Sequence, residues 1–106
     1  MNAVMKVSGR QVAAARVLVG VSRAELARAF GISVEEMGRI EASGSTPLAA
    51  GDVERALRAL DTFGAVFIPE GDGLGAGVRL KFMRLDAKQI GRMEGEGGNV
   101  GEDDVP

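Results

Sequence analysis

Two Ser-x-x-Glu motifs stand close together in the chain, Ser22…Glu25 and Ser33…Glu36, with Gly31 between them. In such a motif the serine hydroxyl accepts a hydrogen bond from the backbone amide three residues later, and the glutamate carboxylate accepts one from the serine amide. The chemistry that these residues predict is therefore helix capping. Each motif predicts the start of a helix, and Gly31 predicts the left-handed residue that ends the first of the two.

The side chains that most often carry catalysis or bind metals are missing. The 106 residues include no histidine and no cysteine, which removes the usual general base, the commonest metal ligand and any thiolate site. The stretch GDGLGA at residues 71–76 matches the letters of a dinucleotide-binding fingerprint, but an alternating, strand-like run follows where that motif needs a helix. We therefore expect no enzyme, no cofactor and no metal site.

Charge is distributed unevenly along the chain. The net charge is −2, yet residues 1–50 carry six basic side chains against four acidic ones, and residues 91–106 carry one against five. A basic front half favours a nucleic-acid partner, whereas an acidic run at the end is usually solvated. No apolar stretch is long enough for a signal peptide or for a membrane span of about 20 residues. The sequence thus predicts one small cytoplasmic domain.

Apolar residues recur at helical spacing along four segments of residues 8–64. Candidate caps precede these segments, and glycines or a Ser-Gly-Ser run follow them. The predicted caps are Ser8, Ser22, Ser33 and Asp52, and the predicted ends are Gly20, Gly31, residues 43–45 and Gly64. The predicted apolar faces are Val12, Ala15, Leu18 and Val19; Leu26, Ala27 and Phe30; Met37 and Ile40, with Val34 as an alternative; and Val53, Ala56, Leu57, Leu60 and Phe63.

After residue 64 the hydrophobic period changes from 3.6 to 2. Residues 66–68 form a short β-rich run, and residues 78–82 alternate apolar with basic side chains across a glycine-rich loop, so we predict a β-hairpin over residues 65–83. Residues 1–7 are predicted to be a flexible leader, and residues 84–106 a weak helix with a disordered acidic tail. The predicted fold class is mainly α, a four-helix domain at residues 8–64 followed by a two-stranded antiparallel hairpin.

Residues 9–64, with the signature SRAELARAFGISVEEMGRIEASG, resemble the helix-turn-helix domains of the phage-repressor and Xre type. Ala27 where the two helices cross, Gly31 in the turn and Ile40–Glu41 at the end of the third helix match the family pattern. In this family the third helix enters the DNA major groove and the second lies across the backbone. The resemblance implies a DNA-binding transcriptional regulator, which we expect to be associated with the nucleoid.

The resemblance places base reading on exposed residues of the third helix. By position these are Ser33, Val34, Glu35, Gly38 and Arg39. Arg39 is the main candidate, because a guanidinium can bond the O6 and N7 atoms of guanine together. Val34 offers a contact to a thymine methyl group, while Glu35 either accepts from a cytosine amino group or only stabilises the helix N-terminus. Gly38 costs the helix about 1 kcal/mol relative to alanine, which close approach to DNA or simple drift would explain.

The resemblance also implies contacts to phosphate and one ion pair. The predicted phosphate contacts are Ser22 and Arg23 at the start of the second helix and Ser43 and Ser45 after the third, with ordinary capping or turn formation as the alternative for the serines. Arg16 and Glu41 are predicted to form a partly buried structural ion pair, with a phosphate contact as the alternative for Arg16.

We expect the predicted hairpin to pack against a second chain, because a lone two-stranded hairpin is marginally stable in water and exposes unpaired backbone groups at its edge. We expect a homodimer about a twofold axis through residues 65–83, with Phe67, Leu80 and Phe82 as its apolar centre. A repressor that acts as such a dimer on double-stranded DNA is the first hypothesis. The alternative is a protein-binding module, an antitoxin or adaptor, that holds a partner protein through the hairpin or the acidic tail.

Overall fold

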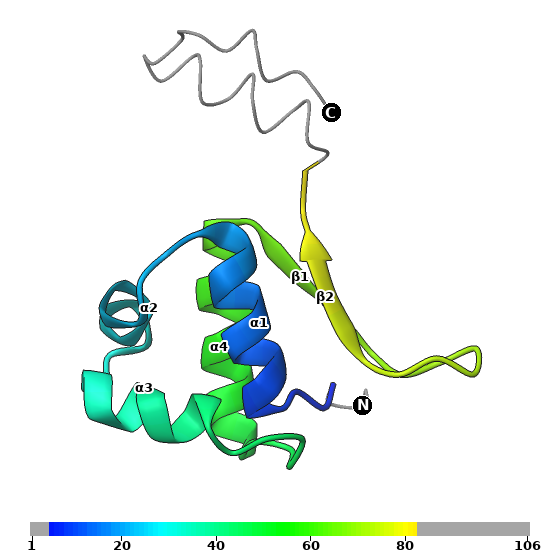
Figure 1. The fold of residues 1–106 in the computed structure, drawn as a ribbon, viewed down its shortest axis with the longest axis horizontal. Helices are drawn as coiled ribbons and strands as arrows, with labels where there is room; N and C mark the ends of the chain where they lie inside the picture. The colour runs from blue at the N-terminus through cyan, green and yellow to red at the C-terminus, as the bar shows by residue number, and fades with distance from the viewer. Residues whose placement is uncertain (1–4, 83–106) are drawn as a thin grey trace, which may run out of the picture.

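A computed structural model of the chain describes residues 5–82. Four helices, α1 (Gly9–Val19), α2 (Arg23–Phe30), α3 (Val34–Glu41) and α4 (Ala50–Phe63), precede the strands β1 (Ala65–Ile68) and β2 (Gly77–Leu80). α1 and α4 lie side by side, α2 and α3 lie on one side of them, and the hairpin packs on the other (Figure 1). The predicted fold class is confirmed. The predicted weak helix and acidic tail at residues 84–106 lie outside the described residues, as do residues 1–4.

Capping boxes open α1 and α2. Ser8 Oγ accepts a hydrogen bond from the Gln11 amide at 3.2 Å, and the Ser8 amide donates to Gln11 Oε1 at 3.0 Å. Ser22 and Glu25 make the same exchange at 3.0 and 2.8 Å, which confirms the predicted box. The hydrogen bonds from the Ser22 backbone and hydroxyl lower the pKa of Glu25, and the Arg28 charge adds to this effect. Gln11 adds a second box that the sequence analysis did not predict.

Two other helix starts differ from the prediction. Ser33 Oγ accepts from the Glu36 amide at 3.0 Å, but among residues 5–82 no reciprocal bond joins the Glu36 carboxylate to the Ser33 amide. This box is therefore half formed, and Glu36 is exposed. The prediction of Asp52 as the cap of α4 is wrong, because the helix starts earlier, with Ala49 at the N-cap and no side-chain cap. Asp52 instead pairs with Arg55 within the first turns, at 3.4 Å.

The hydrophobic core lies between the helices and the inner face of the hairpin. Its largest fully buried side chains are Val7, Val12, Leu26, Met37 and Leu60. The prediction of a flexible leader over residues 1–7 is wrong at its last residue, because Val7 is in this core and its carbonyl accepts a hydrogen bond from the Leu48 amide at 2.9 Å. Leu18 was expected on the buried face of α1 but is exposed.

The strand register decides which hairpin residues face the core. Ala65 pairs with Leu80 and Phe67 with Val78, so these four side chains share one face of the hairpin. This face packs on α1 and α4, except at its end, where Leu80 remains 40% exposed. Phe67 is only 5% exposed. Its predicted place at the centre of a dimer interface is therefore wrong, since the ring already belongs to the core of its own chain. The opposite face of β1, with Val66 and Ile68, is exposed.

Candidate DNA interface

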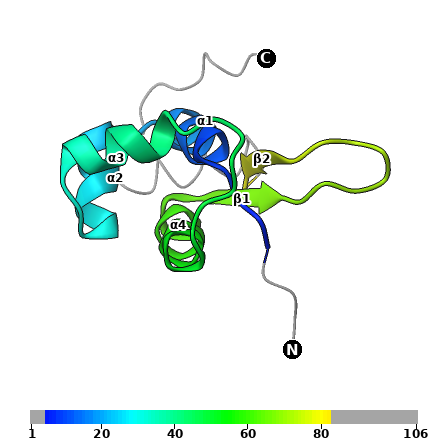
Figure 2. The ribbon, with the colours of Figure 1, turned by 90° about the horizontal axis from the view of Figure 1, so that it is seen from below.

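A tight turn joins α2 to α3. Gly31 has φ +82°, and its amide donates to the Ala27 carbonyl at 2.9 Å, as does the next amide, of Ile32, at 3.0 Å. Both helices bury one face, through Leu26, Ala27, Phe30 and Met37. Because the turn is short and both inner faces are held in the core, α3 has a fixed orientation at the end of the molecule away from the hairpin loop (Figure 2).

The outer side of α3 is exposed to solvent. Ser33, Val34, Glu35 and Arg39 are exposed as the reading role requires, and Glu36, whose carboxylate is free of the expected capping box, joins them. We refer to these five residues as the α3 surface. It carries one basic and two acidic side chains. Gly38 is half-buried, so its backbone is less accessible than the sequence suggested.

Glu41 accepts hydrogen bonds from two arginines at the end of α3. Arg16 Nε donates to Glu41 Oε2 at 2.7 Å and Arg16 Nη2 to Oε1 at 3.3 Å, while Arg23 Nε donates to Oε1 at 3.1 Å. Arg16 Nη1 donates to the Val21 carbonyl at 3.2 Å, so all three nitrogens of Arg16 have partners within the protein. The Glu41 side chain is 4% exposed, against 18% for Arg16 and 48% for Arg23. This geometry favours a structural role for Arg16 and leaves the Arg23 head partly in solvent.

Two of the three serines predicted to contact phosphate already have hydrogen-bond partners within the protein. Ser22 Oγ caps α2, and Ser43 Oγ donates to the Ile40 carbonyl at 2.7 Å. Ser45 is exposed. All three serines therefore lie at helix ends or in the loop after α3, where capping and turn chemistry account for the first two.

Two basic residues that the sequence analysis did not single out lie beside this loop. Lys6 and Arg10 are exposed and line the same surface groove as Ser45. The Arg10 amide donates to the Gly44 carbonyl at 3.0 Å, which fixes the loop against the start of α1. Their signal in the sequence was only the basic excess of residues 1–50, because nothing local indicates that α1 begins next to the end of α3.

The described residues hold neither a candidate metal centre nor a candidate membrane span. Between residues 5 and 82, no three histidine, cysteine, aspartate or glutamate residues are grouped so that they could hold a metal ion. None of the helices in that range is long and apolar enough to cross a membrane.

Two short helices held at a fixed angle by a glycine turn, with polar and charged side chains on the outer side of the second, define a helix-turn-helix domain of the DNA-binding class. In agreement, the family model described as "Helix-turn-helix domain" matches residues 9–66, more than half of the chain. The chain belongs to this family, whose domains are of the Xre and Cro type. A comparison with curated proteins found no match.

Proposed function

We propose that the protein is a sequence-specific transcriptional regulator, a repressor, that acts as a cytoplasmic homodimer on twofold-symmetric DNA without catalysing a reaction. The observation that carries the proposal is the α3 surface, which stands clear of the core on a rigid turn with Arg39 exposed. An α-helix with its side chains is about 10–12 Å in diameter, and the major groove is about 12 Å wide, so a helix such as α3 can enter the groove.

The charges on the α3 surface favour specificity over affinity. Glu35 and Glu36 repel phosphates wherever the helix is out of register, whereas Glu35 in register accepts a hydrogen bond from a cytosine amino group. With only Arg39 as a cation on that helix, one subunit binds weakly, and two subunits on one duplex supply the affinity.

Selection from random duplexes tests this function directly. The full chain should enrich a site made of two inverted half-sites about 10 base pairs apart, and its affinity for that site should fall steeply as salt rises. A selection that enriches no sequence would overturn the proposed function.

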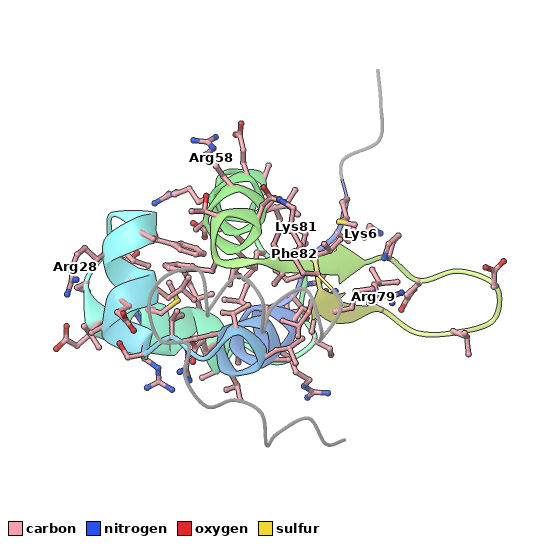
Figure 3. All side chains as sticks on the ribbon, turned by 90° about the horizontal axis from the view of Figure 1, so that it is seen from above. Lys6, Arg28, Arg58, Arg79, Lys81 and Phe82 are labelled. Atoms are coloured by element: carbon pink, nitrogen blue, oxygen red, sulfur yellow. The ribbon has the colours of Figure 1, made fainter. Side chains whose placement is uncertain are left out.

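Arg39→Ala should weaken binding to the enriched site by about 1–3 kcal/mol for each half-site and relax the preference at one base pair of each half-site. The matched control is Arg58→Ala, which removes the same charge from α4, where Arg58 points to solvent (Figure 3). The control should bind the site as the unchanged protein does. Equal losses by Arg39→Ala on the enriched site and on random duplex would instead show that Arg39 contacts only the backbone. Fluorescence anisotropy titrations measure both affinities.

We propose that the homodimer forms through the exposed apolar side chains at the end of the hairpin. Leu80 is 40% and Phe82 45% exposed, and Figure 3 shows Phe82 next to Lys81, whose ammonium lies 5.9 Å from the ring centroid. A truncation at Gly64 is a poor test, because it would also remove Phe67 from the core.

The double variant Leu80→Ser, Phe82→Ser should therefore be monomeric in light scattering, with affinity for the enriched site reduced at least tenfold through loss of the second subunit. Leu74→Ser is the control, since Leu74 is 73% exposed in the hairpin loop, away from this patch. Its dimer should be unaffected. A double variant that stays dimeric would place the interface on the helices.

A further inference from the structure

Arg23 has a guanidinium that is fixed on one side and free on the other. Its Nε donates to Glu41 Oε1 at 3.1 Å, which restrains the group on that side. Among residues 5–82 no partner accepts a hydrogen bond from its Nη1 or Nη2, and the side chain is 48% exposed. Four N–H groups of a permanent cation are therefore available to an anion from solvent.

The Arg23 head lies over Gly38 of α3. A Cβ atom at Gly38 would be 3.6 Å from Arg23 Nη1, and, apart from the two chain neighbours of Gly38 and the helix's own nearby backbone, no other atom lies within 4 Å of it. Alanine would fit this space at ordinary van der Waals distance, but a longer side chain would occupy the place of the guanidinium. The half-buried state of Gly38 thus has a cause within the protein, which the sequence did not reveal.

Glu41 can orient the Arg23 guanidinium because its own carboxylate is fixed by hydrogen bonds from Arg16. The carboxylate is almost fully buried, and two bonds from Arg16 fix both of its oxygens. Arg23 is the first residue of α2, at the end of that helix where Ser22 caps it. Phosphate groups bind at such helix starts, through arginine and backbone N–H groups, when the second helix of the motif lies across the DNA backbone.

We infer that Glu41 and Gly38 are positioning residues for Arg23. Glu41 fixes the guanidinium through Nε, Gly38 leaves the surface of α3 open beneath Nη1, and the free Nη edge donates to a phosphate oxygen of DNA. This inference rests on the proposed function. In this arrangement the Gly38 backbone does not contact a base. The contact to DNA is made by Arg23 of α2, whose side chain lies over the surface of α3.

Three single variants and one double variant test it on the enriched duplex. Arg23→Ala and Gly38→Leu should each weaken binding about tenfold for each half-site, the low end for a hydrogen bond to a charged group, and so about a hundredfold for the dimer on the whole site. Each should also reduce the slope of log affinity against log salt by about 1.8, which is about 0.9 for each of the two phosphates released. The double variant should bind like Arg23→Ala alone, because both changes remove the same contact. Gly38→Ala should bind within about twofold of the unchanged protein.

Two controls separate positioning from folding. Leucine and alanine are both better helix formers than glycine, so thermal melting should show Gly38→Leu and Gly38→Ala at least as stable as the unchanged protein. Should leucine prevent folding, Gly38→Gln displaces the guanidinium with a polar side chain. Arg23→Lys should not restore binding, because one ammonium cannot hold Glu41 through one nitrogen and a phosphate through another.

Each alternative outcome overturns the inference. A loss by Gly38→Leu that is equally large in the Arg23→Ala background would show that Gly38 itself contacts DNA, and so would a tenfold loss by Gly38→Ala. Unchanged binding by Gly38→Leu would show that Arg23 needs no space there, and full activity of Arg23→Lys would show that only charge matters. Failure to enrich any duplex overturns the proposed function instead, before the variants are compared.

Discussion

Arg16→Ala is expected to lower the free energy of unfolding by about 3 kcal/mol, the low end of the cost of breaking a buried ion pair by removing one partner, because Arg23 still pairs with Glu41. The variant leaves the Glu41 carboxylate, 4% exposed, with Arg23 as its remaining charged partner among the described residues. It also removes the donor from the Val21 carbonyl. Urea denaturation followed by circular dichroism measures the loss.

Arg23→Ala is the matched control for stability. It removes the same charge from the same carboxylate, but its side chain is 48% exposed, so its ion pair with Glu41 contributes at most about 1 kcal/mol. The variant that replaces both buried partners, Arg16→Met with Glu41→Leu, should recover most of the stability lost by Arg16→Ala, because no charge is then stranded. An unchanged unfolding curve for Arg16→Ala together with weakened DNA binding would assign Arg16 to a phosphate contact.

Gly9→Ala is the second substitution with a large expected effect. The start of α1 lies so close to the end of α3 that a Cβ at Gly9 would overlap the Ile40 carbonyl oxygen and Ser43 Oγ. The carbonyl belongs to the backbone and cannot rotate away, so the two helices must separate. We expect a loss of about 2–3 kcal/mol, in the upper part of the usual range for overpacking.

Gly51→Ala provides the control for that experiment. Gly51 lies in the first turn of α4, and a Cβ there would meet no atom within 4 Å beyond its chain neighbours and the helix's own backbone, so alanine should be neutral or raise stability by up to about 1 kcal/mol. The melting temperature of Gly9→Ala should fall below that of the unchanged protein, whereas that of Gly51→Ala should stay the same or rise. Equal stability of Gly9→Ala and the unchanged protein would mean that α1 and α3 do not make this contact in solution.

The helix ends could be read from the sequence where a local hydrogen bond defines them. Ser8 and Ser22 cap helices, and Gly20, Gly31 and Gly64 end them with positive φ, as predicted. The bonds involved span three to five residues, so the motif contains all the partners. The start of α4 was missed because the side chain of Ala49 cannot cap a helix. Asp52 was predicted as the cap, but an aspartate is also favourable within the first turn of a helix.

For residues with more than one possible partner, the sequence did not determine which partner they contact. The alternation of β1 placed Phe67 on the face opposite Val66 and Ile68, but it could not say whether that face meets another chain or the same one. The structure packs it on α1 and α4. Likewise, the sequence predicted only a phosphate contact for Arg23, whereas in the fold its Nε also donates to Glu41, 18 residues away.

The sequence by itself therefore determined the four helices, the glycine turn, the hairpin and the family, because each depends on periodicity or on bonds between near neighbours. Only the tertiary structure decided that Gly9 must lack a side chain, that Glu41 joins Arg16 to Arg23, and that Lys6 and Arg10 lie beside the loop after α3. These features arise where α1 crosses the end of α3. The free energy of such contacts comes from burial and electrostatics between segments that are distant in the chain. A local sequence pattern therefore does not indicate which distant side chain will contact a given residue.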